Sequence, residues 1–84
     1  MIVFAGIFVS NLSCHTNWQD LKDHFKQSGN VVYADIMMGR TRSKGLGFVD
    51  FDTPEEASKA IADLNESLLH DHAIYVTEKY SLHL

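Results

Sequence analysis

Residues 44–51, KGLGFVDF, carry the clearest structural pattern in this sequence. Alternating side chains along this stretch are typical of a β-strand whose two faces meet different surroundings. The face with charged side chains is expected in solvent, and it holds Lys44, Leu46, Phe48 and Asp50. The other face is expected to meet the core, and its glycines would let the helices approach closely; it holds Gly45, Gly47, Val49 and Phe51. The stretch therefore predicts an aromatic ring, Phe48, on the solvated face of a sheet.

Three more segments have strand-like composition. Residues 7–10, 31–38 and 74–77 are rich in β-branched and aromatic side chains. Turn-forming residues follow the first two segments, and the third alternates as a strand does. The polar turn that follows Met38 predicts a hairpin between the second and third strands. Residues 65–71 are interpreted as a connecting loop.

Two helices are expected between the strands. The first covers residues 18–27, with Asn17 as its cap, Asp20 in its first turn and Gly29 as its stop. The second follows the sequence Thr53-Pro54-Glu55-Glu56, which combines a capping box with proline at the first helical position. Its inward stripe is Ala57, Ala60, Ile61 and Leu64.

The resulting order, β-α-β-β-α-β, predicts an α+β fold of the ferredoxin-like, split βαβ type. In this sandwich two helices cover one face of a four-stranded antiparallel sheet, and the other face stays open. The chain has 84 residues, which suits one domain over residues 1–84, with residues 79–84 as a possible C-terminal tail.

Composition narrows the classes of function. Lys and Arg number 7 against 11 Asp and Glu, which argues against binding of nucleic acid through bulk positive charge, so any such binding must be local. Cys14 is the single cysteine, which leaves no internal disulfide or cysteine zinc site and suits a reducing, intracellular compartment. The apolar opening residues 1–9 are too short to cross a bilayer, and no membrane association is expected.

Alternation along the other strands places two further rings beside Phe48. Phe8 and Ser10 are expected on the open face from the first strand, and Tyr75 and Thr77 from the last. Exposed rings on one sheet surface can stack unpaired bases, at about 1–3 kcal/mol per base. Phosphates would be met by basic residues at the rim of this face: Arg40, Arg42, Lys44 and Lys79.

These segments resemble the RNA recognition motif (RRM) family over nearly the whole chain. Residues 44–51 match its RNP1 pattern at every specified position except Leu46, which stands where an aromatic residue is usual. Residues 7–12, IFVSNL, are similar to its RNP2 hexamer. The resemblance implies that Phe8 and Phe48 stack bases of single-stranded RNA such as mRNA, with Leu46 reducing affinity or site size.

A narrower resemblance concerns the first helix. Residues 17–24, NWQDLKDH, together with residues 33–35, YAD, are similar to serine/arginine-rich (SR) splicing factors and related mRNA-shuttling proteins. This similarity implies a possible secondary surface for RNA or protein at Trp18, Gln19 and Lys22, with a protein partner at the first or second helix. It also implies a role in mRNA processing, in the nucleus or the cytoplasm.

The alternatives to RNA binding are a protein-binding module and an enzyme. Some RRM-like domains bind peptides with weak or no RNA binding, and the methionine pair at residues 37–38 suits an adaptable contact of that kind. An enzyme is not expected. His70 and His72 are close in sequence but have no obvious third metal ligand, so neither a metal nor a cofactor is expected. The five histidines are scattered along the chain: His15, His24, His70, His72 and His83.

Overall fold

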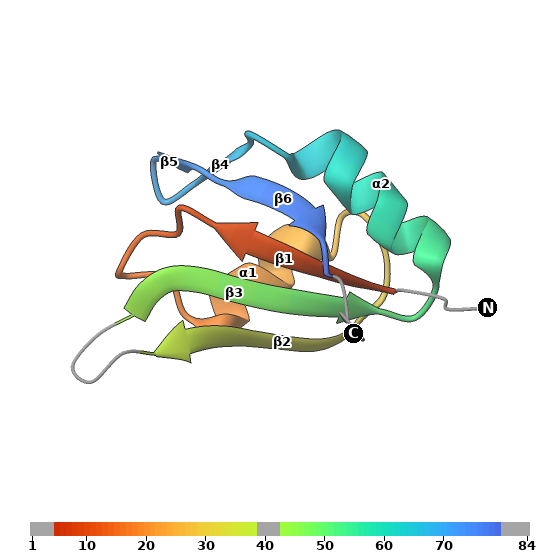
Figure 1. The fold of residues 1–84 in the computed structure, drawn as a ribbon, viewed down its shortest axis with the longest axis horizontal. Helices are drawn as coiled ribbons and strands as arrows, with labels where there is room; N and C mark the ends of the chain where they lie inside the picture. The colour runs from red at the N-terminus through yellow and green to blue at the C-terminus, as the bar shows by residue number, and fades with distance from the viewer. Residues whose placement is uncertain (1–4, 39–42, 80–84) are drawn as a thin grey trace, which may run out of the picture.

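The computed structural model describes residues 5–38 and 43–79. Their elements are β1 (Gly6–Ser10), α1 (Trp18–Phe25), β2 (Val31–Met38), β3 (Ser43–Phe51), α2 (Pro54–Leu64), β4 (Leu68–Leu69), β5 (His72–Ala73) and β6 (Tyr75–Glu78). Four strands form one sheet in the order β2-β3-β1-β6, and all neighbouring strands are antiparallel. In Figure 1 the open face of this sheet looks toward the viewer and α1 passes behind it. The expected α+β, ferredoxin-like fold is confirmed.

The core lies between the sheet and the helices, and the strands supply alternate residues to it. Ile7 and Val9 of β1, like Val49 of β3, are fully buried, and Phe51 is 2% exposed. Phe25 of α1 packs edge-on against Phe51 with 6.5 Å between ring centroids. The predicted inward faces of these strands are therefore confirmed.

Each helix begins at the residue that the sequence indicated. The Asn17 side chain accepts a hydrogen bond from the Asp20 backbone N–H at 2.9 Å, and the Asp20 carboxylate accepts one from Asn17 N–H at 3.2 Å. Thr53 and Glu56 form the corresponding capping box at the start of α2. α1 ends at Phe25 instead of residue 27, because the chain turns after it and Ser28 N–H bonds to the Phe25 carbonyl.

The connection from α2 to the last strand is more regular than a loop. Leu68–Leu69, within the expected loop, form β4 and pair with β5 in a small hairpin, whose turn residues His70 and Asp71 have φ of 52° and 65°. Ile74 lies outside β6, and its N–H and carbonyl bond to the backbone of Ser67 and Glu66. Two-residue strands are too short to have an alternating pattern, so they could not be predicted from periodicity.

The two glycines of β3 have different environments. A Cβ on Gly47 would lie 3.1 Å from Leu21 Cδ2 of α1 and 2.9 Å from the Asp35 carbonyl oxygen, so the predicted close approach of a helix is confirmed there. Gly45 instead has φ of 75° and faces the backbone of Leu12, so the same prediction is wrong for Gly45. None of the helices in the described parts of the chain is long and apolar enough to span a membrane.

Candidate nucleic-acid interface

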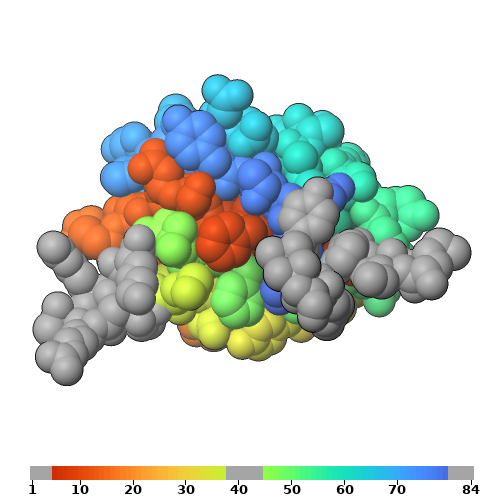
Figure 2. Space-filling view, viewed as in Figure 1, coloured from red at the N-terminus to blue at the C-terminus, as the bar shows by residue number. Residues whose placement is uncertain are grey.

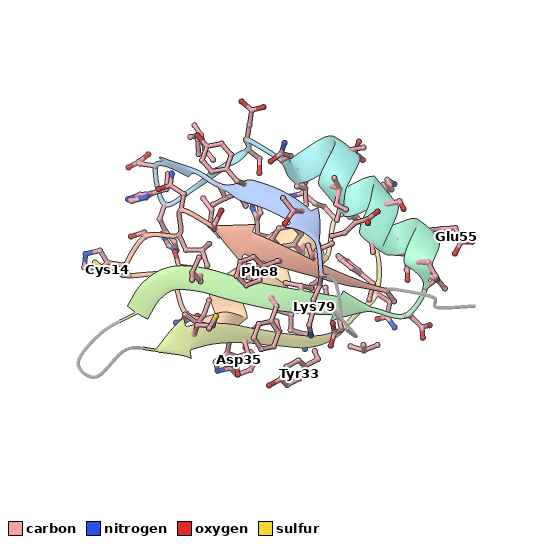
Figure 3. The ribbon with its side chains drawn as sticks, in the orientation of Figure 1. Phe8, Cys14, Tyr33, Asp35, Glu55 and Lys79 are labelled. Atoms are coloured by element: carbon pink, nitrogen blue, oxygen red, sulfur yellow. The ribbon has the colours of Figure 1, made fainter. Side chains whose placement is uncertain are left out.

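Phe8 and Phe48 form the centre of the open face. They lie directly opposite each other in the pairing of β1 with β3, and both side chains are partly exposed. Directly opposed residues of an antiparallel pair share one face, with Cβ atoms about 4.5–5.5 Å apart. Figure 3 shows Phe8 in the middle of the sheet, and Figure 2 shows side chains of β1, β3 and β2 adjoining across the same surface. The structure thus brings together the two rings that the sequence singled out.

Tyr33 is a third ring on this face, and it was missing from the predicted site. Its ring centroid is 5.9 Å from that of Phe48 with an interplanar angle of 31°, and the residue is 50% exposed. The signal that could have found it is the buried Ile36: counting back from that inward residue by alternation places Asp35 and Tyr33 outward.

The predicted residues of the last strand lie along the other side of Phe8. Thr77 is directly opposite Phe8, and Tyr75 is directly opposite Ser10. Tyr75 is therefore a diagonal neighbour of Phe8, at a distance that an aromatic side chain can reach. Tyr75 is 49% exposed, so the predicted outward direction of its ring is confirmed.

Lys79 lies over one of the rings. Its Nζ is 4.5 Å from the centroid of Phe48 and 3.5 Å from Asp50 Oδ1. A hollow of about 260 Å³ beside it is lined by Phe8, Thr77, Glu78 and Lys79. A ligand that stacks on Phe48 must move this ammonium aside, which places a positive charge next to the incoming ligand.

The remaining predicted residues of the face have mixed outcomes. Leu46 is partly buried and lies opposite Met37 of β2. The backbone of Lys44 belongs to β3, whereas its side chain is outside the described part of the structure, as are Arg40 and Arg42. A basic rim at these three positions stays a prediction.

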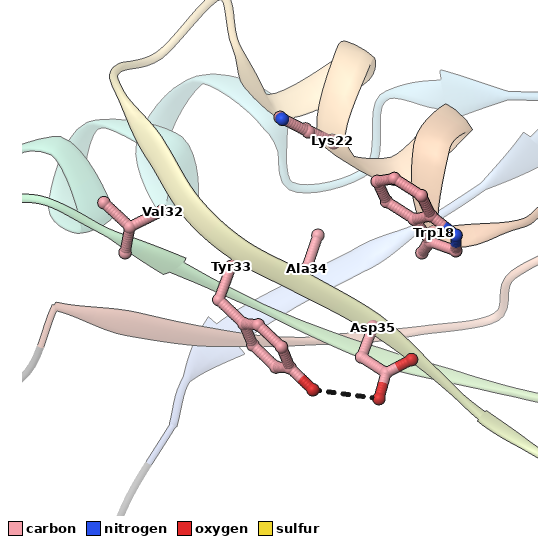
Figure 4. A pocket seen from close by; sticks show the side chains of 6 residues that line it. All are labelled: Trp18, Lys22, Val32, Tyr33, Ala34 and Asp35. Carbon is pink, nitrogen blue, oxygen red and sulfur yellow. Dashed lines mark hydrogen bonds between the residues drawn. The ribbon is translucent and has the colours of Figure 1, made fainter.

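Two hollows flank Trp18, which is 51% exposed at the start of α1. The larger, of about 360 Å³, lies between α1 and the edge strand β2 and is lined by Trp18, Lys22, Val32, Tyr33, Ala34 and Asp35 (Figure 4). The smaller, of about 280 Å³, includes the exposed Cys14. Gln19 lines neither hollow, and its amide donates to Asp23 Oδ1 at 3.4 Å along the helix. Of the predicted secondary surface, Trp18 and Lys22 come together and Gln19 does not.

Two carboxylates of the open face, those of Asp35 and Asp50, act on the Tyr33 hydroxyl. The Tyr33 hydroxyl donates to Asp35 Oδ2 at 3.1 Å, as the dashed line in Figure 4 marks. This hydrogen bond is the main cause that raises the pKa of Tyr33, and the charges of Asp35 and Asp50 act in the same direction. Tyr33 is therefore a neutral phenol at physiological pH.

Within the described residues, the histidines do not gather into a metal centre. Among residues 5–38 and 43–79, no group of three or more His, Cys, Asp or Glu side chains could hold a metal ion. His70 Nε2 instead lies 3.1 Å from Asp20 Oδ2, and His24 Nε2 lies 2.9 Å from Ser67 Oγ. These two histidines connect α1 to the segment after α2.

Comparison with known proteins relates this chain to one protein family. Residues 7–75 match the family model described as RNA recognition motif. Human heterogeneous nuclear ribonucleoprotein M is 44% identical over 70 residues, which is 83% of this chain and 10% of that protein. A serine/arginine (SR)-type shuttling mRNA binding protein of Mycosarcoma maydis is 49% identical over 57 residues, 67% of this chain and 10% of that protein. The chain thus spans about a tenth of these relatives.

A solved structure shares the arrangement of the elements. The Sxl-lethal protein/RNA complex superposes with a TM-score of 0.80 at 26% identity, covering 87% of this chain and 46% of that one. The matched family model covers both strands that carry Phe8 and Phe48 and both helices behind them. The chain therefore belongs to the RNA recognition motif family.

Proposed function

We propose that this domain binds single-stranded RNA by stacking bases on Phe8 and Phe48. The observation that carries the proposal is the direct opposition of these two rings on the face of the sheet that the helices leave open. Aromatic rings on that face do not support the core, whose members are on the other side. Single-stranded RNA offers unstacked bases that can lie flat on such rings.

Stacking also explains how an acidic chain could bind a polyanion. The formal net charge is −4, so long-range attraction of phosphates contributes little. Each base stacked on an aromatic ring contributes about 1–3 kcal/mol, largely independent of net charge. Local cations, with Lys79 next to Phe48, can then contact the backbone of the RNA.

The named relatives support a role in mRNA processing, in the nucleus or in traffic between nucleus and cytoplasm. One of them is named as a nuclear ribonucleoprotein and the other as a shuttling mRNA binding protein. Because the chain spans a tenth of each, we carry over RNA binding by one module and not the activity of a whole relative. Neither name is that of an enzyme, and we propose a binding module without catalysis.

A titration with short RNA oligomers tests the proposal. Chemical-shift changes at Phe8, Phe48 and Tyr75 are expected on adding RNA, and Phe8→Ala should weaken binding measured by fluorescence anisotropy. Leu68→Ala is the matched control, since Leu68 is 67% exposed on β4, outside the four-stranded sheet. Equal affinity of the wild type and Phe8→Ala, or absence of binding to any oligomer, would contradict the proposal.

The hollow between α1 and β2 supports a second candidate, a contact with a protein or a second stretch of RNA. An exposed indole and Val32, 56% exposed, form an apolar lining beside Lys22. Such a lining suits the side chain of a peptide, which is the rival function for an RRM-like domain. Chemical-shift changes confined to Trp18 and Val32 on adding peptides, with no response at Phe8, would favour this candidate over RNA binding on the sheet.

A further inference from the structure

We infer that Asp35 selects guanine at the base that stacks on Phe48. The inference rests on the proposed function and adds the identity of one base to it. Asp35 lies directly opposite Phe48 in the pairing of β2 with β3. Opposed residues share a face, so the carboxylate lies beside the ring and level with the edge of a base stacked on it.

Two hydrogen bonds hold this carboxylate in place. Oδ1 accepts from the backbone N–H of Ile36 at 2.8 Å, and Oδ2 accepts from the Tyr33 hydroxyl at 3.1 Å. An ionised carboxylate can accept about four hydrogen bonds, so each oxygen keeps capacity for one more. The group is thus an oriented pair of acceptors, which a base can use without first ordering the side chain.

Asp50, the other carboxylate of the open face, differs from Asp35 in having a cationic partner. Asp50 pairs with Lys79 at 3.5 Å, whereas no Lys or Arg nitrogen among the described residues lies within 4 Å of the Asp35 carboxylate. Asp35 therefore repels phosphate oxygens and attracts hydrogen-bond donors. RNA that crosses this part of the sheet must present a donor-rich base edge to Asp35, with its backbone turned away.

Guanine meets that requirement better than the other bases. Its Watson–Crick edge carries two adjacent donors, the N1–H and the N2 amino group, which match the two carboxylate oxygens. Cytosine and adenine offer one amino group, N4 or N6, next to a ring nitrogen that is an acceptor. Uracil offers a single N3–H between two carbonyl oxygens, which the carboxylate repels. The expected order of preference is guanine, then cytosine and adenine, then uracil.

The test uses uridine octamers with one central G, inosine, A, C or U, measured by fluorescence anisotropy with the wild-type chain. Hydrogen bonds to an ionised group are about twice as strong as neutral ones. The G oligomer should bind about tenfold or more tighter than the all-U oligomer, and inosine, which lacks the N2 amino group, should fall between them. These comparisons need no variant, so they stay informative whatever a substitution does to folding.

Two substitutions then assign the preference to one side chain. Asp35→Asn replaces one acceptor by a donor and should bring G and U within about twofold of each other. Asp50→Asn is the matched control, a carboxylate on the same face that pairs with Lys79, and it should keep the preference for G. A G preference that persists in Asp35→Asn, or equal binding of all wild-type oligomers, overturns the inference and leaves RNA binding intact. Failure of every oligomer to bind overturns the proposed function and the inference with it.

Discussion

Phe48 and Phe51 lie on the same strand and point to opposite faces, so replacing each by alanine separates binding from folding. Phe51 is 2% exposed and packs edge-on against Phe25. Removing a buried phenylalanine ring costs about 3–5 kcal/mol. A domain of 84 residues has a total free energy of unfolding of about 4–13 kcal/mol at the usual amount per residue. Phe51→Ala should therefore lower the melting temperature by about 12 °C or more.

Phe48→Ala removes different contacts. The ring meets Tyr33 at 5.9 Å and the Lys79 ammonium at 4.5 Å. The aromatic pair is worth about 0.5–1.5 kcal/mol and the cation–π contact about 0.5–1 kcal/mol. The stability cost should therefore stay below about 2.5 kcal/mol, so the variant remains folded. Loss of one stacked base should weaken RNA binding by about 1–3 kcal/mol, or roughly 5- to 160-fold.

Urea unfolding followed through Trp18, the single tryptophan, measures the stabilities, and RNA titration of the folded variants measures affinity. Destabilisation of the domain by Phe48→Ala as large as that by Phe51→Ala would contradict the assignment of the two rings to opposite faces. RNA binding by Phe48→Ala as tight as that of the wild type would contradict stacking on Phe48.

Three further predictions concern strain, pH and salt. Gly45 has φ of 75°, and a left-handed conformation costs other residues about 1–2 kcal/mol. Gly45→Ala should therefore lower the urea midpoint, and an unchanged midpoint would contradict a strained backbone at this position. The N–H of Asn30 donates to the Glu56 carboxylate and is the main cause that lowers its pKa. The stabilisation from Glu56 should therefore be complete above the unfolded-state pKa of this carboxyl and be lost as the pH falls through its lowered folded-state pKa. In urea unfolding at several pH values, the free energy of unfolding should fall less on acidification in Glu56→Gln than in the wild type. If RNA binding neutralises about two to four phosphates, the logarithm of the association constant should fall with the logarithm of the salt concentration at a slope of about −1.4 to −2.8. Lys44→Ala should make this slope shallower by about 0.7, and an unchanged slope would exclude Lys44 from phosphate contact.

The sequence predicted the two central rings because β1 and β3 alternate without interruption around them. Tyr33 escaped prediction because β2 does not: its pairing with β3 shifts register between Val31 and Tyr33. Val31 is 8% exposed and Tyr33 is 50% exposed, although simple alternation would put both on the same face. A bulge inserts a residue, so every face assigned across it is inverted.

Contacts that join distant segments had no local signal either. The position of Lys79 over Phe48 depends on the path of the chain after β6, and no periodicity in the last strand encodes that path. The hydrogen bond from Asn30 N–H to Glu56 likewise joins the turn between α1 and β2 to the start of α2. Capping-box residues could be recognised from sequence, but their second partners come from tertiary packing.

The acidic groups of the open face connect modest affinity to base selectivity. A base that stacks on Phe48 must displace the Lys79 ammonium, whose contact with the ring is worth about 0.5–1 kcal/mol, so the net gain is smaller than the stacking free energy alone. The displaced lysine can remain paired with Asp50, which keeps that carboxylate from repelling the RNA. Asp35 lacks such a partner among the described residues, and its repulsion is relieved only by a base that donates to it. The same negative charge that lowers affinity for RNA in general therefore raises the difference between a guanine and a uracil at this position.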